Sequence, residues 1–91
     1  MRTAPFKLFH ILVKHEYEAQ DVIKKLHEGM SFSQAALKFS TCSSARDGGA
    51  LGPYKSGRFV EAFDEAAVKL PVDKISPPIR TQFGYHVILK K

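Results

Sequence analysis

Several features that would point to a particular compartment or chemistry are scarce in this 91-residue sequence. Cys42 is the only cysteine, so no internal disulfide can form. A reducing compartment fits this composition, although a secreted protein need not have disulfides and a domain cut from a longer exported protein would look the same. No run approaches the roughly 20 apolar residues of a membrane-spanning helix, and residues 1–5 show no signal peptide. A zinc site built from His10, His86 and Cys42 is disfavoured, because the close ligand spacings of zinc sites are absent. We therefore expect a soluble, cytoplasmic, single-domain protein (residues 1–91) without a metal or a membrane partner.

Positive charge exceeds negative charge, with 14 lysines and arginines against 9 aspartates and glutamates. The resulting net charge of +5 is compatible with nucleic-acid binding. The basic residues are scattered, however, and the only adjacent pairs are Lys24-Lys25 and Lys90-Lys91. Proteins that bind single-stranded nucleic acid combine a basic stripe with interleaved aromatic residues, and this sequence has no such stripe. The sequence therefore disfavours a nucleic-acid partner, and weak attraction to acidic surfaces is the simpler interpretation.

Apolar spacing along the chain predicts alternating strands and helices. The expected elements are a strand at 6–13, helices at 16–28 and 32–39, a polar loop at 40–49, an edge strand at 50–54, a turn at 55–58, a helix at 60–69, a poor strand at 75–80 and a final strand from Tyr85. Pro53 should confine its strand to an edge, because proline cannot donate to a sheet. This order predicts an α+β domain with a small, mainly antiparallel sheet.

Two strand-like segments near opposite ends of the chain each carry one histidine in a similar apolar setting. His10 lies within Phe6–Val13, and His86 lies within Phe83–Leu89. Buried imidazoles are costly unless they bond to each other or to another polar group. Either histidine alone is consistent with a core residue bonded to a backbone carbonyl, but the matched settings also favour a functional pair. Thr81, five residues before His86, is close enough in sequence to reach one ring nitrogen.

The remaining candidate residues are one thiol and four apolar side chains. Cys42 lies in a loop rich in serine and threonine, where a lone cysteine is usually a small, half-buried filler. Hydrolysis by a Cys–His pair is disfavoured, because the sequence nearby suggests neither an oxyanion hole nor an orienting carboxylate. Leu51, Phe59, Phe63 and Phe83 are interpreted either as simple core or as a shallow apolar pocket beside the histidines. Such a pocket would suit a small hydrophobic ring such as proline.

Groups of short motifs are distributed along nearly the whole chain. They are His10-Ile11-Leu12-Val13, Phe39-Ser40 with Cys42-Ser43-Ser44, Gly48-Gly49-Ala50-Leu51-Gly52, Gly57-Arg58-Phe59-Val60 with Ala62-Phe63, and Gln82-Phe83-Gly84-Tyr85-His86-Val87-Ile88. Together they resemble the parvulin-type peptidyl-prolyl cis–trans isomerases from about Phe6 to Lys91. The resemblance implies a four-stranded, mainly antiparallel sheet wrapped by three to four helices. It also implies a monomeric enzyme that isomerises X–Pro bonds of unfolded or flexible polypeptides and so assists protein folding.

The same resemblance implies a role for each candidate residue. The implied catalytic residues are His10, Cys42, Thr81 and His86, and the implied substrate-binding residues are Leu51, Phe59, Phe63 and Phe83. In this arrangement the histidines pair at the floor of the site, and Cys42 lies over the amide. No cofactor is expected, because rotation about an amide makes and breaks no bond in the product. The expected partners are proline-containing polypeptides.

The sequence departs from its parvulin-like relatives in three places. Phe59 stands where many relatives have methionine, which should leave the pocket apolar, and Val60 stands where many have glutamine, which removes a polar group. Phosphate-directed relatives carry a basic insertion after the first strand, whereas here residues 14–18 run directly into an acidic helix start. Selectivity for phosphoserine–proline is therefore not expected. The alternative function is a chaperone-like module that binds peptides through the same apolar patch with little isomerase turnover.

Overall fold

A computed structural model describes residues 6–53 and 59–91, which form eight elements of regular structure. In chain order these are β1 (Lys7–Val13), α1 (Glu16–His27), α2 (Phe32–Phe39), the 3₁₀ helix η1 (Ser43–Asp47), β2 (Ala50–Pro53), α3 (Glu61–Lys69), β3 (Ile79–Thr81) and β4 (Gly84–Lys90). The expected order of strands and helices and the α+β class are confirmed. The last residue of the expected edge strand and the turn at 55–58 lie outside the described residues.

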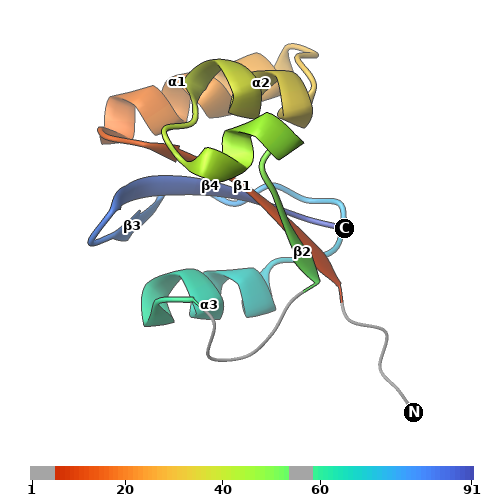
Figure 1. Ribbon diagram of the computed structural model, residues 1–91, viewed down its shortest axis with the longest axis vertical. Coiled ribbons are helices and arrows are strands. Elements are labelled where there is room, and N and C mark those ends of the chain that lie inside the picture. Colours follow the sequence, from red (N-terminus) through yellow and green to blue (C-terminus); the bar gives the residue numbers. More distant parts are fainter. Residues whose placement is uncertain (1–5, 54–58) are drawn as a thin grey trace.

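The four strands form one antiparallel sheet in the order β2-β1-β4-β3 (Figure 1). The first and last long strands are therefore central neighbours, and their register pairs His10 with Ile88 and Leu12 with His86. The prediction from Pro53 is confirmed, since β2 is an edge strand that pairs only with β1. This topology brings the two histidine-bearing segments together although 76 positions separate them in the sequence.

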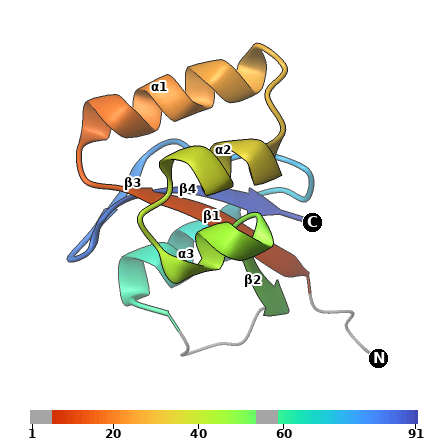
Figure 2. The ribbon, with the colours of Figure 1, turned by 45° about the horizontal axis from the view of Figure 1, so that its top comes forward.

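Helices cover both faces of the sheet, with α1 and α2 on one face and α3 on the other (Figures 1 and 2). Two buried clusters fill the layers between them. Between the sheet and α1 and α2 lie Ile11, Val13, Ala19, Val22, Ala35, Ala36 and Val87; between the sheet and α3 lie Leu8, Phe63, Ala67 and Ile88. Because β1 and β4 are buried on both faces, their apolar runs read as continuous rather than alternating.

Local signals explain where the helices begin and end. The hydroxyl of Ser31 accepts a hydrogen bond of 3.1 Å from the amide of Gln34 and so caps the start of α2. The carboxylate of Glu18 accepts one of 2.9 Å from the amide of His15 at the start of α1. Gly29 follows α1 with φ of +113°, a conformation that favours glycine. None of the helices in the described ranges is long and apolar enough to cross a membrane.

The structure adds detail to two of the expected irregular segments. The polar loop at 40–49 contains the 3₁₀ helix η1, which is capped by Gly48 with φ of +68°. Its short i→i+3 turns suit a serine-rich segment that the helical spacing of apolar residues does not reveal. The expected strand at 75–80 is reduced to one bridge at Ile75 and the short strand β3, because the two prolines between them have no amide hydrogen to donate.

Candidate active site

The histidine pair lies on the face of the sheet that α3 covers. His10 on β1 and His86 on β4 are 6% and 4% exposed. Their Nδ1 atoms are 3.0 Å apart, and the rings are nearly parallel, with an angle of 20° between their planes. The expectation that the two imidazoles bond to each other is therefore confirmed by the geometry. The alternative, in which each histidine bonds separately to a backbone carbonyl, is wrong, because the two Nδ1 atoms contact each other.

Thr81 extends the pair into a short chain of hydrogen bonds. Its Oγ1 lies 2.7 Å from Nε2 of His86, as its position in the sequence suggested. The same oxygen accepts a hydrogen bond of 3.2 Å from the backbone amide of Phe83 in the turn between β3 and β4. The turn that carries the Phe83 side chain is thus connected to the histidines through one hydroxyl group.

Counting donors and acceptors favours one arrangement of the protons. Since the Phe83 amide already donates to Thr81, the threonine hydroxyl is free to donate to Nε2 of His86. His86 then carries its proton on Nδ1 and donates it to Nδ1 of His10, which leaves the proton of His10 on Nε2. That atom is buried without a hydrogen-bond partner among the described residues. The reverse arrangement would leave both Nε2 of His10 and the Thr81 hydroxyl proton without partners, so it is less favourable.

Both histidines are neutral at pH 7. Burial and, as the smaller cause, the proximity of His86 together lower the pKa of His10 to about 4. Burial alone lowers the pKa of His86 to about 4. The physical cause is the loss of water around a charged imidazolium, which favours the uncharged ring. The pair therefore provides a polar but uncharged floor.

An apolar cavity of about 390 Å³ opens above this floor. In the described part of the chain it is lined by His10, Leu12, Cys42, Leu51, Phe59, Val60, Phe63, Phe83 and His86. Its volume is at the small end of the roughly 300–1,000 Å³ typical of ligand pockets, as expected for a ligand group no larger than a small ring. Seven of the eight predicted site residues line it, and the eighth, Thr81, lies behind His86. Leu12 was missed, although its place on the face of His10 was a usable signal.

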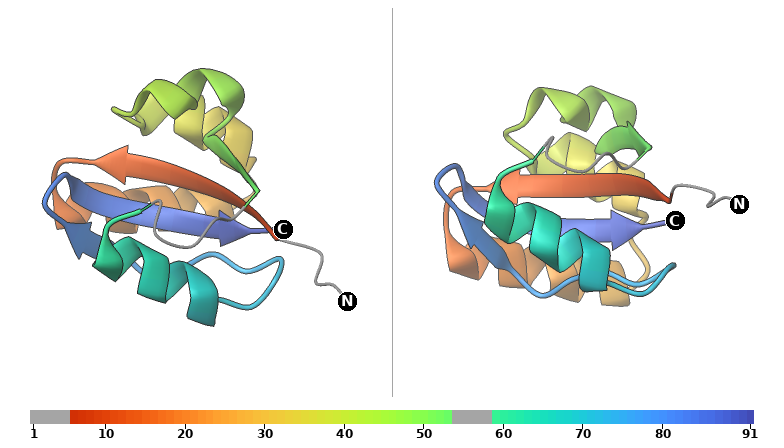
Figure 3. Two further views of the ribbon diagram at one scale, coloured as in Figure 1. Left: turned by 60° about the horizontal axis from the view of Figure 1, so that its bottom comes forward. Right: turned by 90° about the horizontal axis from the view of Figure 1, so that it is seen from below.

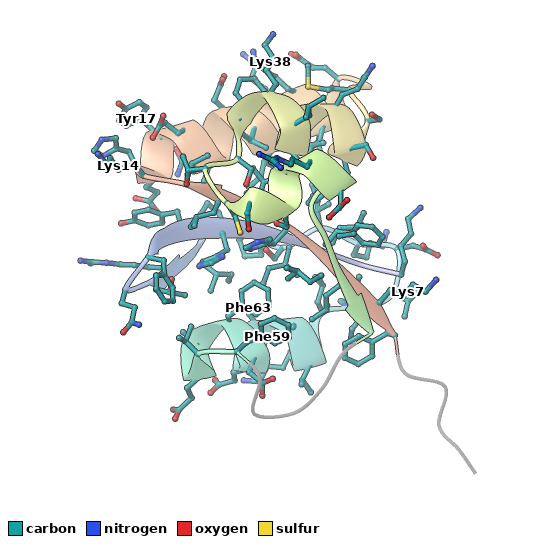
Figure 4. All side chains as sticks on the ribbon, in the orientation of Figure 1. Lys7, Lys14, Tyr17, Lys38, Phe59 and Phe63 are labelled. Carbon is teal, nitrogen blue, oxygen red and sulfur yellow. The ribbon has the colours of Figure 1, made fainter. Side chains whose placement is uncertain are left out.

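Aromatic rings form one wall of the cavity. Phe59 and Phe63 rise from the beginning of α3 toward the sheet (Figure 4), with their ring centroids 4.8 Å apart. The ring of Phe63 stands almost perpendicular to both imidazoles and is 2% exposed, so it belongs to the deep end of the cavity. Phe59 is half-buried, and Phe83 is 60% exposed at the rim. A ligand would therefore contact Phe59 and Phe83 before it reached Phe63.

The loop that carries Cys42 is fastened to β1 on both sides of the thiol. The amide of Thr41 donates to the carbonyl oxygen of Leu12 over 2.8 Å, and the amide of His10 donates to that of Gly49 over 2.9 Å. Gly49 has φ of +86°, and a Cβ there would meet the His10 carbonyl oxygen at 2.5 Å, so only glycine permits this close approach. These contacts hold Cys42 over the histidine-bearing strand.

The thiol of Cys42 is half-buried at the edge of the cavity. Burial would raise the pKa of this thiol, but hydrogen-bond donors of Ser44 and Ser43 outweigh that effect and lower it. Within residues 6–53 and 59–91, Nε2 of His10 has no hydrogen-bond partner, so the thiol is not bonded to that atom. Cys42 is therefore a polar neighbour of the cavity rather than half of a Cys–His pair.

Comparisons with known proteins agree on one family. The model of the rotamase family, described as the PPIC-type PPIase domain, matches residues 10–91. The foldase protein PrsA of Bacillus subtilis is 46% identical over 82 residues, which cover 89% of this chain and 28% of that protein. The foldase PrsA of Exiguobacterium sibiricum is 49% identical over 84 residues, with 90% and 28% covered. The chain thus spans less than a third of the length of these curated relatives.

Solved structures show the same architecture. The crystal structure of PrsA from Bacillus subtilis has a TM-score of 0.91 at 44% identity, and the match covers 94% of this chain and 34% of that one. The solution structure of NmPin, the parvulin of Nitrosopumilus maritimus, has a TM-score of 0.88 at 38% identity. That match covers 98% of both chains. The predicted four-stranded sheet with its surrounding helices is therefore confirmed.

Proposed function

The chain belongs to the PPIC-type, or parvulin-type, family of peptidyl-prolyl isomerases, and from this we propose that it catalyses cis–trans isomerisation of X–Pro bonds. The observation that carries the proposal is the apolar cavity of about 390 Å³ with a neutral histidine pair at its floor. Its size and lining suit a prolyl ring, and the residues that the family resemblance singled out meet there.

The proposed mechanism acts on the resonance of the amide bond. Rotation about a peptide bond has a barrier of about 18–20 kcal/mol, because the planar form has partial double-bond character. In the twisted transition state the amide loses that resonance, so its dipole is smaller than in the planar form. Water solvates the planar form better, whereas an apolar pocket that excludes water favours the twisted form. Leu51, Phe59 and Phe63 grip the ring while the bond rotates.

The polar residues in this proposal shape the site rather than transfer protons. His10 and His86 are neutral, and three of their four ring nitrogens already have partners within the pair or on Thr81. Thr81 holds the ring of His86 at the correct angle. Cys42 is an electrostatic neighbour of the substrate carbonyl, since Nε2 of His10 has no hydrogen-bond partner among the described residues and so does not act as a base toward the thiol. No bond is made or broken, so neither a nucleophile nor a cofactor is required.

The proposed substrates are unfolded or flexible polypeptides in which the residue before proline carries no phosphate. β1 ends at Val13 and α1 begins at Glu16, so only Lys14 and His15 separate them. The first turn of α1 contains Glu16 and Glu18 and no lysine or arginine, so it supplies no positive charge to bind a phosphate group. The proposal also includes assistance to protein folding, a monomeric state and a cytoplasmic location. Light scattering on the purified chain and fractionation of cells test the last two.

A protease-free exchange assay tests the central proposal. Magnetisation exchange between the cis and trans forms of a panel of X–Pro peptides is measured by NMR with and without the protein, at several substrate concentrations. Acceleration that saturates with substrate supports the isomerase. Binding of the peptides without accelerated exchange would instead select the chaperone-like module, and neither binding nor acceleration would refute both functions.

A further inference from the structure

A buried lysine joins three segments on the side of the sheet that carries the cavity. Lys90 is 6% exposed and lies on the same face of β4 as His86 and Ile88, because side chains alternate along a strand. Its Nζ donates a hydrogen bond of 3.1 Å to the carbonyl oxygen of Val68 near the end of α3. The same nitrogen lies 3.8 Å from the centroid of the Phe6 ring. Lys90 thus links β4 to α3 and to the residue that precedes β1.

The ammonium group of Lys90 contacts a carbonyl oxygen and an aromatic ring, which carry partial negative charge, rather than a carboxylate. Among the described residues no carboxylate lies within ion-pair distance of it, since the ion pairs found there join Lys25 to Asp21 and Lys69 to Glu65. Burial lowers its pKa, which shows that the charged form loses favourable contact with water. The carbonyl groups at the end of a helix and the face of an aromatic ring are the groups that compensate for this loss. Lys90 is therefore held at one specific place.

The helix that Lys90 fastens is the one that forms the aromatic wall. α3 lies along the lower face of the sheet (Figure 3), where Phe63 and Ala67 pack against Leu8 and Ile88. The cavity lies between the beginning of this helix and the histidine pair, and Lys90 contacts the opposite end. α3 has nine residues and is about 13 Å long, so a tilt of about 5° at its anchored end displaces the other end by about 1 Å.

We propose that Lys90 is a positioning residue for the prolyl pocket: it fixes the carboxyl end of α3 to the sheet and thereby sets how far the aromatic wall stands from the histidines. The inference rests on the proposed isomerase function, because a pocket wall displaced by about 1 Å weakens the grip on the prolyl ring. Lys90 contacts neither the cavity nor a substrate within it, and it acts through Phe59 and Phe63.

Lys90→Met tests this role, since methionine retains an unbranched apolar side chain and removes the ammonium group. We expect KM to rise about fivefold, which corresponds to about 1 kcal/mol of binding, with kcat changed less than about twofold. Lys90→Arg retains the positive charge and should restore most of the affinity. Hydrogen exchange at the amide of Leu70, which donates to Ala66 at the end of α3, should accelerate in the methionine variant.

Two matched variants separate positioning from general stability and from charge. Val22→Ala destabilises the cluster on the opposite face of the sheet, and Lys69→Met removes an exposed ammonium from the last turn of α3. Both should keep the KM of the unaltered chain, measured well below the melting temperature of each variant. If Lys90→Met does not fold, Phe6→Leu removes the aromatic face alone and should raise KM about twofold by the same reasoning.

The outcomes distinguish this inference from the proposed function. An unchanged KM in folded Lys90→Met, or an equal rise in Val22→Ala, would overturn the positioning role while leaving the isomerase intact. If the unaltered chain shows no isomerase activity, the proposed function fails. The rate of hydrogen exchange at the Leu70 amide and the affinity for the peptides then still decide whether Lys90 positions α3. Equal exchange at Leu70 in the unaltered chain and in Lys90→Met would also overturn the role.

Discussion

Acidification should destabilise this protein as the pH falls from 6.5 toward 4. The buried pair His10 and His86 has a pKa of about 4 in the folded chain, against 6.5 for an ordinary histidine. As the pH falls below 6.5 the unfolded chain takes up protons that the folded chain excludes, so the free energy of unfolding must decrease. Stability from the neutral pair is fully present above pH 6.5 and is lost progressively toward pH 4.

The size of this effect follows from the two pKa values. Between pH 7 and pH 5 each histidine should remove about 2 kcal/mol from the free energy of unfolding, and the pair about 4 kcal/mol. Urea unfolding followed by circular dichroism at pH 7, 6 and 5 measures this loss. In the double variant His15→Gln/His27→Gln, which lacks the two exposed histidines, the free energy of unfolding should depend on pH as in the unaltered chain. In His10→Leu about half of that pH dependence should remain. A free energy that is constant within about 0.5 kcal/mol over this range would refute the assignment of a buried neutral pair.

Three further substitutions test the roles of single residues. Cys42→Ser should keep at least about a third of kcat/KM in a protease-free assay, because the proposed role is electrostatic; complete loss in the folded variant would favour covalent chemistry. Thr81→Val should cost about 1–2 kcal/mol of stability and should alter the ¹⁵N shifts of His86, since its Nε2 loses a partner; unchanged shifts would contradict the proton arrangement. Phe59→Ala should raise KM about fivefold to tenfold, through the loss of about 1–1.4 kcal/mol of apolar contact, whereas Val68→Ala on the exposed side of α3 should not.

The main features of the fold were predictable because the sequence patterns are regular. α1 and α2 begin and end within one residue of the ranges that apolar spacing predicts, and Pro53 correctly indicated an edge strand. The 3₁₀ helix η1 was not predictable from periodicity, because it contains no apolar repeat and its contacts are turns of three residues. β3 is short, as the expected poor strand at 75–80 implied, because Pro77 and Pro78 have no amide hydrogen to donate to a sheet.

The candidate site was predictable in composition but not in geometry. The matched settings of His10 and His86 indicated a pair, and the apolar residues predicted to form a shallow pocket beside them, to which the family resemblance gave a substrate-binding role, line the cavity. No pattern along the chain gives the 3.0 Å contact of the two Nδ1 atoms, because that distance depends on the register between the first and the last strand. Lys90 was noticed only as part of a basic pair, since burial of a lysine is a tertiary property.

The register between β1 and β4 therefore controls both the core and the site. Side chains alternate along a strand, so a shift of β1 by one residue would move His10 to the face that α1 and α2 cover. Leu8 and Leu12 would move to that face with it and would leave the layer between the sheet and α3. The apolar core on both faces of the central strands opposes such a shift, because Leu8, Ile11 and Ile88 are completely buried. The residues that keep the histidines together are thus the residues that hold the domain together. Substitutions at His10 should consequently change stability and activity together, whereas substitutions at Cys42 or Phe59, at the edge of the cavity, should separate the two.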